Sequence, residues 1–172
     1  MALVARHPEY ADKIVGFGVP IFPSEEAARK HLGSLGFLAR LMANGSPLAP
    51  RMCRLMCDYR SFARFLAPLL APRLPYLVAA DGVDHIWESY AGTLNVVLSR
   101  NQAKEWATAL AARLHLVYGA ADRTSPPNAA IRTLGNRSGA RIKVVEGGDH
   151  HLPLRQAKFC ARYLRAILDR RR

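Results

Sequence analysis

Two stretches of the sequence decide its fold class: Leu-His-Leu-Val-Tyr-Gly at residues 114–119 and Arg-Ile-Lys-Val-Val at residues 141–145. Both are short runs of apolar and β-branched side chains, which are typical of β-strands. A helical pattern closed by Gly135 lies between them, and an amphipathic helix is predicted to begin near Leu154. The order strand, helix, strand, helix predicts parallel neighbouring strands joined by a right-handed crossover. We therefore expect an α/β fold.

The pattern upstream of these strands has two parts. Residues 13–21 form a short apolar run closed by prolines, which predicts a further strand. Residues 24–110 contain no convincing strand, and their apolar side chains recur at helical spacing. Ser24, Glu25 and Glu26 are a typical helix start, with a capping hydroxyl and acidic residues in the first turn. The middle of the chain is therefore predicted to be helical.

Composition limits the class of protein. A chain of 172 residues, half of them apolar, is long enough for about one domain with a real core. The longest apolar stretch, residues 66–80, is interrupted by three prolines and an arginine, so no membrane span is expected. Three cysteines cannot all pair, and Cys53 and Cys57 are spaced as on one helix face. Reduced thiols and a cytoplasmic location are the expectation.

The net charge of +12 raises the question of nucleic-acid binding. The basic residues are spread along the whole chain, and the one tight run is residues 169–172 at the C-terminus. A nucleic-acid surface is typically a cluster of Lys and Arg with aromatic residues between them. A basic nucleic-acid-associated protein is therefore a less favoured alternative, and no nucleic-acid partner is expected.

Ionisable side chains follow both predicted strands. Asp122 comes three residues after Gly119, and His150 comes five residues after Val145. In a parallel sheet, ligands bind beyond the carboxyl ends of the strands, and adjacent strands lie about 5 Å apart. Adjacent strands would thus bring a carboxylate within reach of an imidazole. A hydrolytic triad needs such a pair, because the carboxylate orients the imidazole that serves as base and then as acid.

Simpler interpretations of these residues remain open. Asp122 is equally suited to shaping a turn or capping the next helix. His150 and His151 are consistent with a solvated loop pair, or with a metal site that includes Asp149. Such a site would need a further ligand from elsewhere in the chain, so no metal is expected. No glycine-rich nucleotide-binding motif is present, and no cofactor is expected.

Several motifs together resemble the last third of α/β-hydrolase-fold enzymes. They are Gly119-x-x-Asp122, Ser125-Pro126-Pro127, and Glu-Gly-Gly-Asp-His-His-Leu-Pro-Leu at residues 146–154. Residues 2–23 are similar to the segment after the nucleophile elbow in that family. The resemblance implies the C-terminal part of this fold, with an inserted helical cap. Residues 1–23 and 111–172 would belong to the hydrolase core, and residues 24–110 would be the cap or lid.

The resemblance also implies roles for individual residues. Asp122 would be the triad acid, His150 the triad base, and His151 its neighbour at the substrate. The substrate would be a small, mostly apolar ester or related carbonyl compound. Apolar side chains of the cap are candidates for lining its pocket, Trp87 first among them. The others are Phe62, Phe65, Leu66, Leu69, Leu70 and Tyr90.

The sequence departs from the family at the nucleophile. No counterpart of the Gly-x-Ser-x-Gly elbow, the oxyanion-hole loop or the first five strands occurs in the 172 residues. Counting back from Arg6 places the family's serine about six or seven residues before Met1. We therefore expect a truncated hydrolase that is inactive by itself. The alternative is an inactive remnant acting as a binding or dimerisation module, for example a homodimer formed through the exposed edge of strand 13–21.

Overall fold

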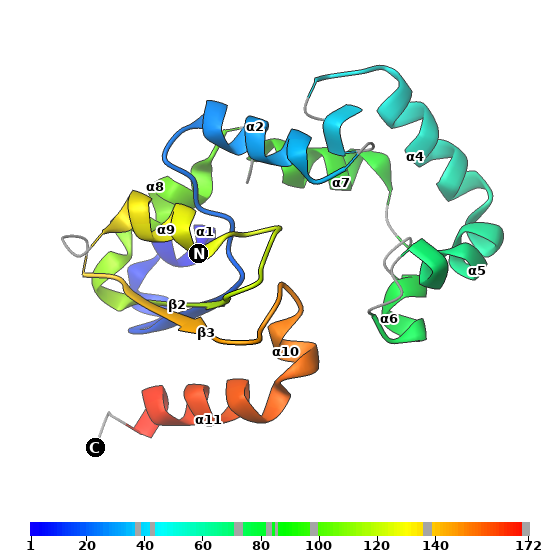
Figure 1. Ribbon diagram of the computed structural model, residues 1–172. Coiled ribbons are helices and arrows are strands. Elements are labelled where there is room, and N and C mark those ends of the chain that lie inside the picture. The colour runs from blue at the N-terminus through cyan, green and yellow to red at the C-terminus, as the bar shows by residue number, and fades with distance from the viewer. Residues whose placement is uncertain are drawn as a thin grey trace. The chain divides into compact units, whose positions relative to one another are not determined.

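A computed structural model describes residues 1–36, 39–41, 44–70, 74–81, 84, 86–96, 100–135 and 139–169 (Figure 1). The side chains of Leu70, Trp87, Tyr90 and Leu94 lie outside this description. The chain divides into two compact units. The first comprises Met1–His31 together with Val96–Arg172, and the second comprises Leu32–Asn95. Both boundaries fall inside the segment 24–110, so its first and last helical residues belong to the first unit.

The first unit contains a three-stranded parallel sheet. Its strands are β1 (Ile14–Phe17), β2 (Leu114–Gly119) and β3 (Arg141–Val145), in the order β1-β2-β3. Every residue of β2 is buried, as expected for a central strand covered on both faces. The mixed α/β class is thereby confirmed, as are the bounds of the strands predicted at 114–119 and 141–145. The strand predicted over residues 13–21 is shorter, because Gly18 leaves the extended conformation with a φ of 58°.

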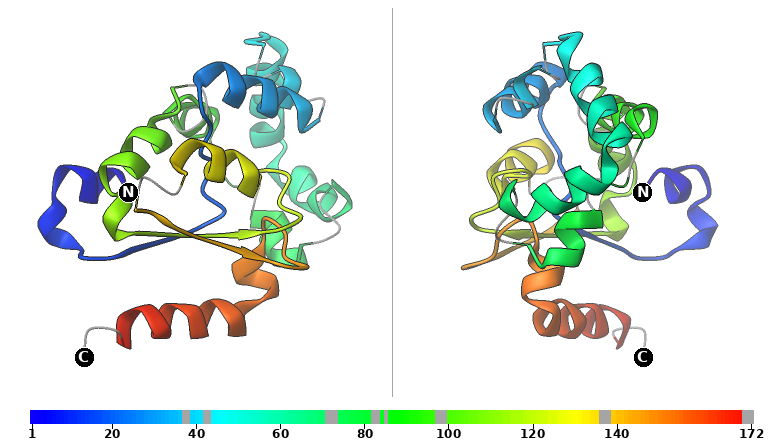
Figure 2. Two further views of the ribbon diagram at one scale, coloured as in Figure 1. Left: turned by 60° about the vertical axis from the view of Figure 1, so that its left-hand side comes forward. Right: turned by 90° about the vertical axis from the view of Figure 1, so that its right-hand side faces the viewer.

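Helices cover both faces of this sheet (Figure 2). α8 (Gln102–Ala109) and α9 (Pro127–Leu134) pack on one face, and α10 (Leu152–Arg155) and α11 (Ala157–Leu168) pack on the other. Alternate side chains of β2 point to opposite faces and supply both cores. The core on the α8 and α9 side includes Leu114, Leu116, Tyr118, Ala107 and Ala130, and the core on the α11 side includes Val117, Leu152 and Cys160.

Short helices complete the first unit. The N-terminal segment forms α1 (Ala2–Arg6), which contacts α8, and a 3-10 turn at Pro8–Tyr10. A second 3-10 turn, Ala111–Arg113, leads into β2. α2 (Glu25–Ser34) begins as the sequence predicts, because the Oγ of Ser24 accepts the Ala27 N–H at 3.1 Å. The chain passes from the first unit into the second within α2.

Helices are the only regular secondary structure among the described residues of the second unit, in agreement with the sequence. It comprises α4 (Leu48–Asp58), α5 (Arg60–Leu70), α6 (Tyr76–Asp81) and α7 (Trp87–Leu94). Arg64 of α5 forms ion pairs with Asp81, at 3.1 Å, and with Asp84. These pairs connect α5 to the last residue of α6 and to the segment that follows it. In the part of the chain that is described, no helix is both long and apolar enough to cross a membrane.

Candidate active site

The loops after β2 and β3 meet at the carboxyl-terminal edge of the sheet. Two backbone hydrogen bonds join them. The N–H of Ala120 donates to the carbonyl of Val145, and the N–H of Ala121 donates to the carbonyl of Gly148, both at 2.9 Å. These bonds fix the residues that follow, Asp122 in one loop and His150 in the other, relative to each other.

Two glycines make this approach of the loops possible. A Cβ atom on Gly119 would lie 2.3 Å from the carbonyl carbon of Gly148, which is closer than any real contact. A Cβ atom on Gly148 would in turn lie 2.5 Å from a methyl group of Leu152. In the sequence, both glycines stood out only as part of the motifs that contain them. The signal for their role was present, since a glycine ending a buried strand often marks a close backbone approach.

Asp122 is held by contacts to both carboxylate oxygens, and its side chain has no exposed area. Oδ1 accepts hydrogen bonds from the N–H groups of Thr124, at 2.9 Å, and Ser125, at 2.8 Å. Oδ2 lies 3.1 Å from Nδ1 of His150. The carboxylate therefore shapes the turn and pairs with the imidazole at the same time. The two interpretations of Asp122, as a turn residue and as the partner of an imidazole, are compatible.

His150 is oriented by this contact. Because an ionised carboxylate only accepts hydrogen bonds, the proton lies on Nδ1, and Nε2 of the neutral ring carries the lone pair. The hydrogen bond to Asp122 raises the pKa of His150, and its partial burial opposes that rise. Among the described residues, Nε2 has no hydrogen-bond partner, and 35% of the side chain is exposed. An imidazole held in this way can accept a proton at Nε2.

The carboxyl-terminal end of β1 also lies next to Asp122 and His150. Gly18, directly after β1, has a φ of 58°, and a Cβ atom there would lie 3.1 Å from Nδ1 of His150 and 3.3 Å from Oδ2 of Asp122. The Gly18 N–H donates to the carbonyl of Val117 at 2.9 Å, which fixes the glycine against β2. Gly18 is a residue that the sequence pattern did not single out. The signal that could have found it was a glycine within an otherwise apolar run.

The residues beside His150 stabilise the loop. Oδ1 of Asp149 accepts the N–H of His151 at 3.0 Å, and Oδ2 accepts Nη1 of Arg155 at 2.6 Å. Burial works against ionisation of Asp149, but these donors outweigh it and lower the pKa of that carboxyl group. The ring of His151 lies edge-on to that of His150, with centroids 5.5 Å apart. No group of three metal-ligating side chains occurs among the residues described.

The structure brings Asp122, His150 and His151 together, but it does not test the role expected for Trp87. Trp87 is the first residue of α7 in the second unit, and its side chain lies outside the described part, as do those of Leu70 and Tyr90. The Arg170–Arg172 run at the C-terminus also lies outside it.

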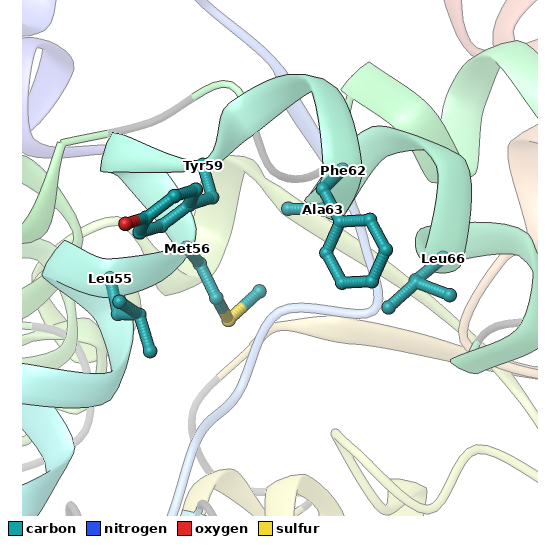
Figure 3. A pocket seen from close by; sticks show the side chains of 6 residues that line it. All are labelled: Leu55, Met56, Tyr59, Phe62, Ala63 and Leu66. Atoms are coloured by element: carbon teal, nitrogen blue, oxygen red, sulfur yellow. The ribbon is translucent and has the colours of Figure 1, made fainter.

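The second unit has an apolar groove of its own, of about 410 Å³, between α4 and α5 (Figure 3). Two of the pocket candidates from the sequence, Phe62 and Leu66, line it. Phe62 and Tyr59 have 63% and 64% of their area exposed, so the groove is open to solvent. The remaining lining residues are Leu55, Met56 and Ala63.

Comparisons with protein-family models, with curated proteins and with solved structures found no significant match for this chain. A function for this chain is therefore inferred from its residues and their geometry.

Proposed function

We propose that this chain carries the acid–base half of the active site of a serine-type hydrolase with an α/β-hydrolase fold. The observation that carries the proposal is the contact of 3.1 Å between Oδ2 of the buried Asp122 and Nδ1 of His150. Such a pair fixes the tautomer of the imidazole and stabilises its charged form. The substrate class is a small, mostly apolar ester or related carbonyl compound.

In this reaction, Nε2 of His150 takes the proton from a hydroxyl nucleophile as the oxygen attacks the carbonyl carbon of the substrate. His150 then gives this proton to the leaving alcohol, which departs and leaves an acylated nucleophile. Water next loses a proton to Nε2 and attacks the acyl carbon. The bond between the acyl carbon and the nucleophile's oxygen then breaks, His150 returns the proton to that oxygen, and the carboxylic acid is released. Asp122 keeps its charge throughout and holds the imidazolium that forms twice.

The nucleophile must come from outside the described residues. No serine, threonine or cysteine side chain within them donates a hydrogen bond to Nε2 of His150. Without a positioned nucleophile and donors for the oxyanion, the pair alone contributes little to hydrolysis.

The test compares two proteins. One is the 172-residue chain, and the other is the product translated with all in-frame codons upstream of Met1. Both are assayed with short-chain p-nitrophenyl esters. We expect hydrolysis by the longer product only, and a loss of kcat/KM of about 10³- to 10⁴-fold in His150→Gln and Asp122→Asn. Absence of hydrolysis in the longer product, or hydrolysis that survives His150→Gln, would contradict the proposal.

A second candidate function is that of a dimerisation module, and the position of β1 favours it. β1 pairs only with β2 among the described residues, so its other edge is open. Because the Gly18 N–H points to β2 and N–H groups alternate along a strand, that of Val15 faces the open edge. Val15→Pro removes this donor and should abolish a dimer seen by sedimentation equilibrium. A wild-type chain that stays monomeric would exclude this function.

A further inference from the structure

His31 of α2 contacts the loop that holds Asp122. Its Nε2 lies 2.8 Å from the carbonyl oxygen of Arg123 and 3.2 Å from that of Thr124. Because carbonyl oxygens only accept hydrogen bonds, Nε2 carries a proton and donates to them. The ring also packs against Phe22, with centroids 5.0 Å apart.

The two carbonyls belong to the two peptide groups that hold Asp122. The Arg123 carbonyl shares its peptide group with the Thr124 N–H, and the Thr124 carbonyl shares its peptide group with the Ser125 N–H. Both of these N–H groups donate to Oδ1 of Asp122. His31 therefore holds the oxygen ends of the peptide groups whose nitrogen ends hold the carboxylate.

Hydrogen bonds in such a chain strengthen one another. A donor at the carbonyl end polarises the peptide group and makes its N–H a better donor at the other end. It also fixes the tilt of the peptide plane, and thereby the direction in which the N–H points. Oδ1 of Asp122 is aligned in this way, and Oδ2 of the same rigid carboxylate faces His150.

We propose that His31 is a positioning residue for the Asp122–His150 pair, acting through the peptide groups 123–124 and 124–125. The inference rests on the proposed function for its catalytic consequence. Its structural content is independent of that function, because it concerns the strength of the hydrogen bond between Asp122 and His150.

The opposing explanation is that His31 only attaches α2 to the first unit. α2 has another attachment, since Ala28 is fully buried in a cluster with Phe22 and Ala129. Replacing His31 is therefore expected to leave the helix in place. Two variants separate the roles of the side chain. His31→Phe keeps a ring against Phe22 but removes the donor, whereas His31→Gln keeps an N–H donor near the position of Nε2.

The experiment uses the 172-residue chain and proton NMR at low temperature. The readout is the low-field resonance of the Nδ1 proton of His150 and its rate of exchange with water. In His31→Phe, we expect the resonance to move upfield and the exchange rate to rise by about tenfold, in line with the loss of a hydrogen bond. His31→Gln should resemble the wild type. Lys30→Ala, an exposed neighbour on α2, is the control.

An unchanged resonance in folded His31→Phe, or equal changes in His31→Phe and His31→Gln, would overturn the inference. If His31→Phe fails to fold, His31→Asn, whose shorter amide falls short of the carbonyls, is assessed by the same two criteria. In the longer product, His31→Phe should lower kcat by about tenfold with KM unchanged. Failure of the proposed function would appear separately, as absence of hydrolysis with the NMR pattern intact.

Discussion

Gly119 and Gly148 are in direct backbone contact, and this contact brings Asp122 and His150 to the same edge of the sheet. Their closeness leaves no space for a side chain at residue 119. A Cβ atom there would lie 2.3 Å from the carbonyl carbon and 2.4 Å from the carbonyl oxygen of Gly148, which is well below a normal contact distance. The neighbour is backbone, so it cannot move aside as a flexible side chain would. The geometry of the candidate site therefore depends on a residue with no functional group.

Gly119→Ala is accordingly expected to lower the free energy of unfolding by about 2–4 kcal/mol, within the range for overpacked and strained sites. Urea denaturation followed by circular dichroism measures the change. The matched control is Gly147→Ala in the adjoining loop, where φ is 68° but no atom lies within 4 Å of the added methyl group. That variant should lose only about 1 kcal/mol, from its backbone conformation. Equal losses would mean that crowding at Gly119 is unimportant.

The Asp122–His150 hydrogen bond predicts how stability depends on pH. It raises the pKa of His150 in the folded protein above the ordinary value of 6.5. The folded state thus binds this proton more tightly than the unfolded state. The resulting stabilisation is fully present below pH 6.5 and is lost as the pH rises through the raised folded pKa.

Asp122→Asn removes the charge that produces this effect. NMR titration should show a lower pKa for His150 in the variant. Denaturation at about pH 6 and about pH 9 should show a larger loss of stability at the lower pH. His151→Gln, which leaves the Asp122–His150 hydrogen bond in place, is the control. A His150 pKa that is the same in the wild type and in Asp122→Asn would disprove the coupling.

The sequence predicts the strand pair and the contact between Asp122 and His150 because both follow from local pattern and one topological rule. Strands 114–119 and 141–145 are apolar runs with clear ends, and a right-handed crossover makes them parallel neighbours. Residues that follow parallel neighbours share an edge of the sheet. Both inferences can be made without knowing how the side chains pack in the folded protein.

The contributions of Gly18 and His31 were not predictable in this way. Gly18 follows a strand whose end the sequence pattern places four residues too late, at Ile21 instead of Phe17, because periodicity does not register a single residue with positive φ. His31 lies on a helix 92 residues away from the carbonyl of Arg123 that it contacts. Contacts between side chain and backbone over such separations depend on tertiary packing, which leaves no periodic trace in the sequence.

Gly18→Ala is expected to disturb the Asp122–His150 pair directly. The added methyl group would meet Nδ1 of His150 at 3.1 Å and Oδ2 of Asp122 at 3.3 Å, on a backbone with φ of 58°. The Nδ1 proton resonance of His150 should therefore shift, and stability should fall by about 1–2 kcal/mol. Gly139→Ala has a similar φ of 78° but meets its nearest atom at an ordinary 3.7 Å. It should lose stability without shifting that resonance, and a shift in Gly139→Ala alone would contradict the assignment.

Ser125 has two buried polar groups, the backbone N–H and the side-chain hydroxyl, and only the first forms a hydrogen bond among the described residues. Its N–H donates to Asp122 at 2.8 Å, whereas its buried Oγ has no hydrogen-bond partner among the described residues. Ser125→Ala keeps the backbone donor and removes only the unsatisfied hydroxyl, so its desolvation cost disappears.

We therefore expect Ser125→Ala to be neutral or to stabilise the protein by up to about 1 kcal/mol, with the resonance of His150 unchanged. Ser24→Ala is the contrast, since the Ser24 Oγ caps α2 through the Ala27 N–H and its loss should cost about 1 kcal/mol. Urea denaturation of both variants measures whether the free energy of unfolding rises or falls. A loss of 1 kcal/mol or more in Ser125→Ala would mean that the hydroxyl group binds a partner, such as a buried water molecule, and that the loop that holds Asp122 depends on it.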